Sequence, residues 1–324
     1  MTVEARAAGT QDEGTGASGQ VSALLWARML ERVRSQDWPV GALYVVATPI
    51  GNLGDLGLRA WQALSQADVV AAEDTRATRV LFDAWGLTTP LMAAHRHNEA
   101  GAAQNIVARL REGARVALVS DAGAPAVSDP GARIVREVRA AGLRVIPVPG
   151  ASAVISALMA SGATSDENPA FLFAGFAPSK ATARQNWLRQ WGSLPVPVVL
   201  FESPHRLAAM LDDMLALFGA ARLVTVAREL TKRYEQVETL ALEDAAVWLA
   251  QDAHRLQGEF VLVLHEAQAD AADQGGQALE QADELLSALL RGVSVRDAAR
   301  LAAQALGLPR DVLYARALAL KQAD

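Results

Sequence analysis

Short runs of apolar and β-branched residues alternate with longer segments of helical periodicity between residues 43 and 162. Runs of about five such residues are typical of strands buried on both faces, whereas three- and four-residue spacing indicates amphipathic helices. The pattern predicts strands at 43–47, 68–72, 115–119 and 143–148, and helices at about 57–66, 75–84, 99–111, 131–141 and 152–161. Strand and helix that alternate in this way indicate a parallel sheet covered on both faces.

A polar, turn-rich segment at 163–169 separates a second α/β region from the first. This region has more strand per residue, so antiparallel pairing is possible. Its predicted strands are 170–174, 197–202, 222–227, 236–241 and 259–264, and its predicted helices are 181–191, 205–217 and 243–251. Three helices follow at about 278–291, 294–306 and 309–322. The short break between the last two resembles a helix-turn-helix, a pattern that an ordinary helical hairpin shares.

The first 20 residues are small and polar and are expected to be disordered, whereas 20–38 have the spacing of a short amphipathic helix that ends before Pro39. The expected fold is therefore α/β, with two α/β domains and a small C-terminal helical region. The expected divisions are a flexible N-terminal extension with a short helix (1–40), an N-terminal α/β domain (41–162), a C-terminal α/β domain (163–267), a linker (268–277) and a helical tail (278–324).

Composition excludes several classes of protein. The chain has no cysteine, so it has no disulfide framework, no cysteine-based zinc site and no thiol nucleophile. No leader pattern opens it, and no apolar run approaches the ~20 residues that span a bilayer. We expect a cytoplasmic protein with no membrane partner. The net charge of −6 argues mildly against nucleic acid, but acids without any base are concentrated in 268–290 and local basic faces remain. An RNA partner therefore stays open.

Four stretches rich in small and turn-forming residues follow predicted strands, at 48–55, 72–76, 120–131 and 149–153. Small residues at strand ends let a flat ligand approach the backbone closely. The dinucleotide fingerprint G-x-G-x-x-G and the P-loop are both absent, and Pro49 stands where a phosphate cradle would need an N–H group. The sequence therefore predicts a ligand without a pyrophosphate, although each stretch alone is also compatible with an ordinary capped loop.

Charged residues follow several of these strands. Glu73 and Asp74 beside Arg76 could orient a substrate or perform acid–base chemistry, or Arg76 could simply neutralise acids at a helix start. His95 and His97 have no third ligand in view, so no metal site is expected. The runs 201–206 and 228–233 also follow strands directly, and each is either functional or a solvated face.

Nine motifs in a fixed order resemble the ribosomal RNA small subunit methyltransferase I family of the tetrapyrrole-methylase-like superfamily. They are ATPIGNLGD (47–55), AAEDTR (71–76), HRHNE (95–99), SDAGAPAVSDPG (120–131), VPGASA (148–153), GFAPSK (175–180), FESPHR (201–206), ARELTK (227–232) and GEFVLV (258–263). The resemblance covers about 43–266, with a family-like helical tail. It implies two α/β domains with S-adenosyl-L-methionine in the cleft between them. It also implies 2′-O-methylation of a decoding-centre cytidine in 16S rRNA of the 30S subunit, usually by a homodimer.

The resemblance also carries expectations for single residues. Cofactor contacts are expected at Pro49, Gly51, Asp121, Gly123, Ala124, Ser152, Ala153, Phe201 and Glu202. Substrate contacts are expected at Arg76, His97, Asn98, Lys180, Arg206 and Lys232. Candidates for a catalytic base are Glu73, Asp74 and Glu229, and His97 and Glu202 are further candidates. Two features depart from the family pattern: Ala124 stands where Thr is expected, which removes a hydroxyl contact, and residues 1–40 are longer than the family requires.

A methyl group on a sulfonium needs no metal, so the protein has to align a ribose hydroxyl with it and remove the proton. Lys180 and Lys232 could bind phosphate or polarise the nucleophile. The helix that carries Arg184, Trp187, Arg189 and Trp191 either faces RNA or packs its tryptophans in the core. Two rival functions stay open here: methylation of a tetrapyrrole or other small molecule, and a ligand-sensing DNA-binding regulator that uses 294–322. A nicotinamide dehydrogenase ranks last because the phosphate fingerprint is missing.

Overall fold

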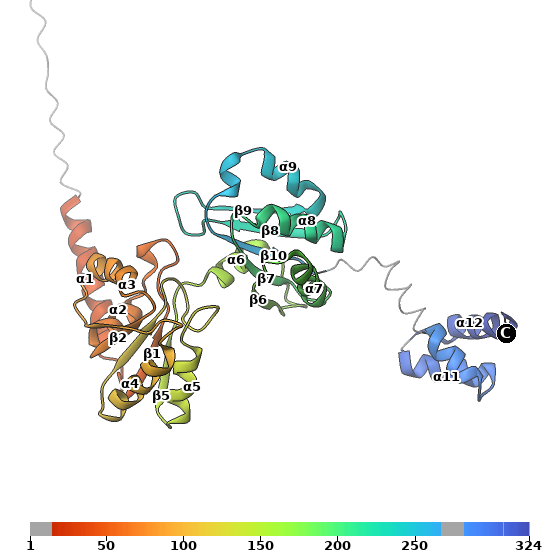
Figure 1. Cartoon of the computed structure of the whole chain (residues 1–324), viewed down its shortest axis with the longest axis horizontal. Helices are drawn as coiled ribbons and strands as arrows, with labels where there is room; N and C mark the ends of the chain where they lie inside the picture. Colours follow the sequence, from red (N-terminus) through yellow and green to blue (C-terminus); the bar gives the residue numbers. More distant parts are fainter. Residues whose placement is uncertain (1–14, 267–281, 307, 324) are drawn as a thin grey trace, which may run out of the picture. The chain divides into compact units, whose positions relative to one another are not determined.

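The structure is a computed structural model that describes residues 15–266, 282–306 and 308–323. The chain divides into two compact units, Met1–Glu266 and Ala267–Asp324, and each is described by itself (Figure 1). The predicted acidic linker, 268–277, lies outside the described residues. Among the helices that the structure describes, none is long and apolar enough to cross a membrane.

Helix α1, Thr15–Arg34, begins earlier than the sequence predicted. Disorder through residue 20 is wrong for the last part of that range, because 15–20 belong to the helix. Its C-terminal end is anchored: Val33 and Trp38 are buried, and Trp38 Nε1 donates to the Val33 carbonyl over 2.9 Å. Each residue added to an anchored helix forms one more hydrogen bond, so the helix extends through small residues of modest propensity.

The first sheet is parallel, with strand order β3-β2-β4-β1-β5. Its strands are β1 Ala42–Val46, β2 Val69–Ala72, β3 Leu91–Ala93, β4 Val116–Val119 and β5 Arg144–Val148. Alternate side chains of β1 enter different cores. Tyr44 packs with α2 (Leu58–Gln66) and α3 (Thr75–Trp85), and Leu43 packs with α4 (Glu99–Arg111) and α5 (Ala132–Ala140). The predicted parallel sheet with two covered faces is confirmed; only β3, a three-residue edge strand, was not predicted.

The second sheet is mixed, with order β6-β7-β10-β8-β9. β6 and β7 pair in parallel and the remaining pairs are antiparallel. Its strands are β6 Leu172–Phe176, β7 Val198–Glu202, β8 Leu223–Arg228, β9 Gln236–Ala241 and β10 Phe260–Leu264. One face is covered by α7 Ala181–Gly192, α8 Leu207–Phe218 and α9 Ala245–Ala250, and the other packs against α6, Ala153–Ser161. Helix α6 links the two sheets in the chain and lies between them in Figure 1.

Helix α7 packs its tryptophans rather than presenting them to RNA. Trp187 and Trp191 lie against the core of the second sheet. Arg184 is only 6% exposed, and its Nε lies 2.6 Å from Asp213 Oδ2 on α8. The RNA-facing alternative is therefore wrong for these three residues, because a stripe at helical spacing is the face that the helix buries. Arg189 alone of the four stays exposed.

Arg184→Ala is expected to lower the free energy of unfolding by about 1–3 kcal/mol, because it leaves the shielded Asp213 carboxylate without its cation. The matched control is Arg189→Ala on the exposed side of the same helix, which should change stability by about 0.5 kcal/mol at most. Urea denaturation of both variants checks this. Equal stabilities would show that the Arg184–Asp213 pair contributes nothing.

The second unit is a small helical bundle. Residues 282–290 are helical, and α11 Val295–Leu306 and α12 Arg310–Ala323 follow. Alanines of α11 and leucines of all three helices form its core. Arg316 on α12 donates both Nε and Nη2 to the carboxylate of Asp283, over 2.6 and 2.7 Å. This two-point contact fixes α12 to the first helix of the bundle.

Candidate functional site

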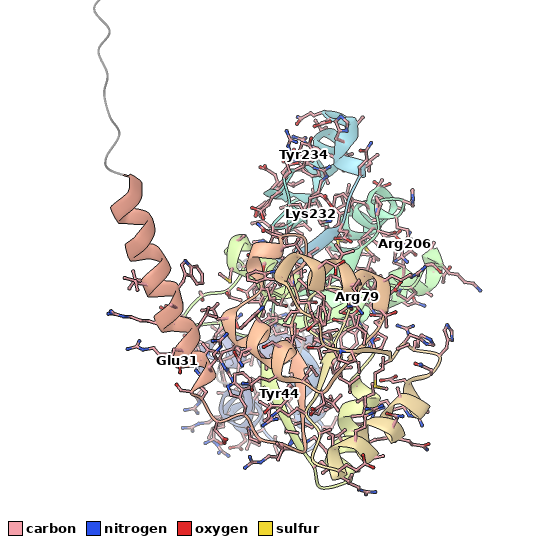
Figure 2. The ribbon with its side chains drawn as sticks, turned by 90° about the vertical axis from the view of Figure 1, so that its left-hand side faces the viewer. Glu31, Tyr44, Arg79, Arg206, Lys232 and Tyr234 are labelled. Carbon is pink, nitrogen blue, oxygen red and sulfur yellow. The ribbon has the colours of Figure 1, made fainter. Side chains whose placement is uncertain are left out.

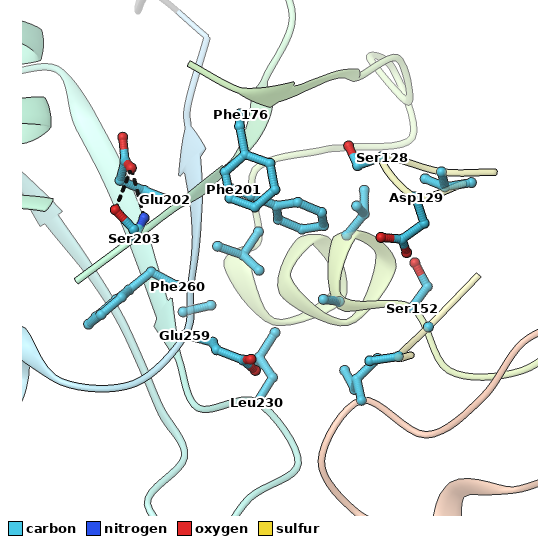
Figure 3. A pocket seen from close by; sticks show the side chains of 18 of the residues that line it. Ser128, Asp129, Ser152, Phe176, Phe201, Glu202, Ser203, Leu230, Glu259 and Phe260 are labelled. Carbon is cyan, nitrogen blue, oxygen red and sulfur yellow. Dashed lines mark hydrogen bonds between the residues drawn. The ribbon is translucent and has the colours of Figure 1, made fainter. Parts of the chain in front are cut away.

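A cavity of about 360 Å³ opens between the first sheet's loops and the second sheet. One wall consists of Ile50, the loop 122–129 and the start of α6. The opposite wall consists of the ends of β6 and β7 and the segment 258–261 (Figure 3). This volume lies at the lower end of the range for small-molecule sites, about 300–1,000 Å³. The carboxyl ends of parallel strands are where α/β folds place ligands, so the cavity is the candidate site.

Strained backbone shapes the first wall. Ala126 and Ser128 have φ of +69° and +65°, a region that non-glycine residues rarely occupy. Thr48 and Gly123 exchange backbone hydrogen bonds of 2.9 and 3.0 Å, which joins the first turn to this loop. At Gly150 an added Cβ would lie 3.0 Å from the Ala47 carbonyl oxygen. The chain segments at this sheet edge therefore approach as closely as glycine permits.

Six of the nine expected cofactor contacts line the cavity. They are Gly123, Ala124, Ser152, Ala153, Phe201 and Glu202. Pro49, Gly51 and Asp121 do not line it, although their neighbours Ile50 and Ala122 do. Sequence reasoning missed other lining residues, among them Val127, Ser128, Asp129, Phe176, Leu230, Gly258, Glu259 and Phe260. Most of these belong to the motifs already quoted, so the motifs marked the right segments but not which side chains face inward.

The charge of the lining is one-sided. Asp129, Glu202 and Glu259 are the acids of the lining, and no Lys, Arg or His is among the described residues that line the cavity. Glu202 and Glu259 are paired with Arg206 and Lys232 outside the lining, so Asp129 is the acid of the described lining that forms no ion pair. The remaining lining is largely apolar, with Ile50, Phe201 and Leu230 among it. Such a cavity suits a ligand with a flat apolar part and a positive charge, and it disfavours a phosphate-bearing one.

Three carboxyl groups gather where the cavity meets the first sheet. Burial, reinforced by the charges of Asp121 and Asp129, raises the pKa of Glu73. Burial and then the charge of Asp121 raise the pKa of Asp129, while a side-chain hydrogen bond with Ser120 and then the charge of Arg96 act in the opposite direction. Asp121 itself accepts the backbone N–H of Asp74 over 2.9 Å. Raised carboxyl pKa values beside a cavity are a feature of acid–base sites.

Asp74 has a different role from Glu73. Its Oδ1 accepts the Arg76 backbone N–H over 2.8 Å, so Asp74 is the N-cap of α3. The Arg76 guanidinium also donates to both carboxylate oxygens, and these bonds lower the pKa of Asp74 to about 2. A carboxylate held so firmly in its ionised form accepts protons poorly. Arg76 therefore neutralises the helix-start acid, and its side chain is otherwise 90% exposed.

Glu229 is held by a cation as well. Its Oε1 and Glu259 Oε2 each lie 2.8 Å from Lys232 Nζ. Burial opposes ionisation, but Lys232 and the Glu259 backbone N–H together lower the pKa of Glu229. Glu229 and Thr231 have φ of +51° and +67°, so the segment is strained. It also touches the first sheet's turn, because a Cβ on Gly51 would lie 2.5 Å from Lys232 Cγ (Lys232 is labelled in Figure 2).

Glu202 is 3% exposed and forms an ion pair with Arg206, whose Nε lies 3.0 Å from Glu202 Oε1. The Ser203 backbone N–H also donates to that oxygen, over 2.7 Å. Arg206 Nη2 donates to the Ala177 carbonyl over 2.6 Å, so this expected substrate contact ties the ends of β6 and β7 together. Few N–H groups of the Arg206 guanidinium therefore remain for contact with a substrate.

The other expected substrate contacts are dispersed. His97 and Lys180 are exposed. Asn98 Nδ2 donates to the Ala93 carbonyl over 3.1 Å, and Asn98 Oδ1 is buried without a partner among the described residues. Glu99, next in the chain, accepts the backbone N–H groups of Gly131 and Arg133 and so caps α5. Over the described ranges, no group of three or more His, Cys, Asp or Glu could hold a metal ion.

Comparison with known proteins identifies the family. The tetrapyrrole (corrin/porphyrin) methylases match residues 42–246, and the RsmI C-terminal HTH domain matches 276–321. Ribosomal RNA small subunit methyltransferase I of Pseudomonas aeruginosa is 43% identical over 86% of this chain and 97% of its own length. The Escherichia coli O157:H7 protein of the same name is 40% identical over 89% of this chain and 99% of its own length. The chain belongs to this family.

Family membership confirms the enzyme class, the fold class and the resemblance of the helical tail to a helix-turn-helix. The chain is an S-adenosyl-L-methionine-dependent methyltransferase, and the regulator alternative is set aside. Two solved structures show the same fold. The methyltransferase CobJ has a TM-score of 0.52 at 19% identity, covering 70% of this chain and 95% of its own. Diphthine synthase has a TM-score of 0.52 at 16% identity, covering 69% and 90%.

The cavity fits S-adenosyl-L-methionine. The cofactor has an adenosine, which suits the apolar wall around Phe201, and a sulfonium charge, which suits a lining with carboxylates and no cation among the described residues. The cofactor has no phosphate group, which agrees with Pro49, a residue without the backbone N–H that a phosphate-binding turn would need. The missing hydroxyl at Ala124 does not remove the site, since Ala124 still lines the cavity beside Gly123, which has no side chain.

Proposed function

We propose that this chain transfers the methyl group of S-adenosyl-L-methionine to the ribose 2′-oxygen of a cytidine in the decoding centre of 16S rRNA. Its substrate is the 30S subunit and it acts as a homodimer. The observation that carries the proposal is the cavity, whose described lining contains no cation and includes Asp129, a carboxylate without an ion pair, in a chain of the rRNA methyltransferase I family. This lining suits a sulfonium nucleoside, and its described residues offer no cation for the pyrophosphate of a dinucleotide.

Residues of both walls would hold the cofactor. Gly123 and Ala124 lie on the first wall together with Ser152, the N-cap of α6, and Ala153, its first residue, and Phe201 lies on the opposite wall. Bound there, S-adenosyl-L-methionine supplies an electrophilic methyl group that needs no metal ion. The protein's contribution is alignment, which can supply roughly 7–11 kcal/mol of the barrier for a bimolecular reaction.

The 2′-hydroxyl must lose its proton as its oxygen attacks. Among the acids of the site, Asp74, Glu202 and Glu229 are each paired with a neighbouring Arg or Lys. Asp129 lines the cavity, has a raised pKa and forms no ion pair within the described chain. Asp129 is therefore the proton acceptor in this proposal. Glu73 raises the local negative charge from a position outside the lining.

Support for the homodimer comes from α6. Ile155 and Met159 lie four residues apart and are 45% and 81% exposed, although both are large and apolar. A partner subunit would cover such a pair. Light scattering should give twice the chain mass, and Met159→Glu should shift it toward the monomer. An unshifted dimer would exclude this face from the contact.

The test of the function uses 30S subunits from cells that lack the modification. With radiolabelled S-adenosyl-L-methionine, purified protein should transfer label to 16S rRNA in those subunits and not to already modified ones. Label transferred to a tetrapyrrole instead of to RNA would support the small-molecule alternative. Cofactor binding without transfer to either subunit preparation would overturn the proposal.

A further inference from the structure

A large aromatic side chain stands at the mouth of the cavity. Phe176, the last residue of β6, lines the cavity and is nevertheless 59% exposed. Its ring lies against Phe201, with centroids 5.3 Å apart (Figure 3). Phe201 in turn packs on Phe173, with centroids 5.0 Å apart. Phe201 is the middle member of this row, and Phe176 is its exposed outer end. The mouth therefore presents an aromatic face that the fold does not cover.

The backbone around Phe176 is fixed on both sides. The pairing of β6 with β7 shifts register between Phe173 and Gly175, and Gly175 has φ of +72°. A Cβ at Gly175 would lie 3.3 Å from Ser128 Oγ, so the strand end touches the opposite wall. On the other side, the Ala177 carbonyl accepts from Arg206. The exposed ring is therefore held in place before any ligand arrives, which reduces the entropy lost on binding.

A cation follows the ring on the same loop. Lys180 is exposed, forms no ion pair within the residues that the structure describes, and is the N-cap of α7. The first turn of α7 has no acid, and its N-cap makes no side-chain hydrogen bond. The positive end of the helix therefore adds to the charge of Lys180. An exposed aromatic ring followed by a cation is complementary to a nucleotide, which has a stacking base and an anionic phosphate.

We propose that the loop from Phe176 to Lys180 binds the target nucleotide, with the Phe176 ring stacked on its base and Lys180 in contact with a flanking phosphate. This inference rests on the proposed function, because it assigns the substrate of that same site. In the proposed function the cofactor fills the cavity interior beside Phe201, so the partner assigned to Phe176 is not the cofactor's adenine. The exposed ring of Phe176 is accessible to a substrate that approaches from solvent. Neither the ring nor the ammonium group takes part in the chemical step.

The test compares substitutions of Phe176 in steady-state methylation of 30S subunits. Removing a base-stacking aromatic costs about 1–3 kcal/mol, so Phe176→Ala should raise the KM for the ribosomal subunit about 5- to 150-fold. Phe176→Trp should restore that KM to within about threefold, whereas Phe176→Leu should not, because it is apolar but cannot stack. The Kd for S-adenosyl-L-methionine, measured by calorimetry, should stay unchanged in all three. Tyr234→Ala is the control, since Tyr234 is a similarly exposed aromatic (65%) outside the lining.

Lys180 is tested by salt dependence. Lys180→Ala should weaken binding to the 30S subunit and reduce the slope of log K against log salt by about 1, the change expected when one phosphate contact is lost. Lys180→Arg should keep the slope. Arg189→Ala, an exposed cation near the other end of α7, should leave the slope as in the unaltered protein.

Two sets of outcomes separate this inference from the function it rests on. If the unaltered protein methylates the 30S subunit and Phe176→Ala keeps its KM, the inference is overturned and the function stands. If Phe176→Ala instead weakens S-adenosyl-L-methionine binding, the ring belongs to the cofactor site and the inference is also overturned. If the unaltered protein transfers no methyl but its direct binding to the 30S subunit depends on Phe176 and Lys180, the function fails and the nucleotide contact stands.

Discussion

Asp129→Asn is expected to lower kcat for methyl transfer by about 10²- to 10⁴-fold, the range for loss of a positioned general base. Asparagine has nearly the same shape, so cofactor and RNA should still bind. The expected signature is a fall in kcat with little change in the Kd for S-adenosyl-L-methionine or in the KM for the ribosomal subunit. The matched comparison is Glu73→Gln, which removes a neighbouring charge with a raised pKa but does not line the cavity. Its kcat should fall far less.

The pH profile offers a second readout for Asp129. Burial and the charge of Asp121 raise its pKa, and only the ionised form accepts a proton. kcat/KM should therefore fall on acidification at a higher pH than an ordinary aspartate, near 3.9, would give. The free energy of unfolding responds to acidification in the opposite direction. A carboxyl group whose pKa is raised in the folded protein binds its proton more tightly there, so its protonation stabilises the fold as the pH falls. Asp129→Asn should then leave the melting temperature unchanged or higher. If Glu73→Gln loses more activity than Asp129→Asn, the base is Glu73.

Gly258→Ala is expected to weaken S-adenosyl-L-methionine binding at least about tenfold, about 1.4 kcal/mol, and to destabilise the protein. Gly258 lines the cavity with φ of +98°, and an added Cβ would lie 2.6 Å from Glu229 Cγ. Left-handed backbone costs roughly 1–2 kcal/mol and the overlap about 1–3 kcal/mol more. Relief of the overlap displaces Glu229 from Lys232, and with it Glu259 and Leu230, which both line the cavity.

The control for Gly258→Ala is Gly142→Ala. Gly142 has φ of +74°, but nothing lies within 4 Å of an added Cβ. This substitution therefore measures the backbone cost without the overlap, at a turn outside the cavity lining. Calorimetry with S-adenosyl-L-methionine and urea denaturation of both variants give the comparison. If the two variants bind the cofactor equally well, the ion pairs of Lys232 do not shape the cavity.

Much of the fold was predictable because the two periodicities differ so clearly in this chain. Strand β9 and helix α4 have the predicted bounds, and other elements differ at their ends by one or a few residues. Strand β3 was missed because Leu91 and Met92 are only partly buried and Ala93 is exposed at a sheet edge, where no apolar run is required. Helix α7 was predicted, but which of its faces is buried was not. Its charges and tryptophans do not reveal from the sequence that Arg184 is buried against Asp213.

The site was predictable as a set of segments but not as a set of side chains. Strand ends indicate where ligands bind, and six expected cofactor contacts do line the cavity. Asp129 and Phe176 were missed because which residue of a loop faces inward depends on its backbone. Ala126 and Ser128 adopt φ values that no sequence periodicity predicts. The ion pairs of Glu202 and Glu229 depend on where Arg206 and Lys232 lie, and only coordinates show both pairings.

The position of the transferred methyl group tests the central claim most directly. 16S rRNA from 30S subunits treated with the protein and S-adenosyl-L-methionine should be digested to nucleosides and analysed by mass spectrometry. One additional 2′-O-methylated cytidine per rRNA molecule, absent when Asp129→Asn replaces the unaltered protein, is the predicted result. A methyl group on a base carbon or nitrogen, or none on the RNA while the cofactor is bound, would contradict the account.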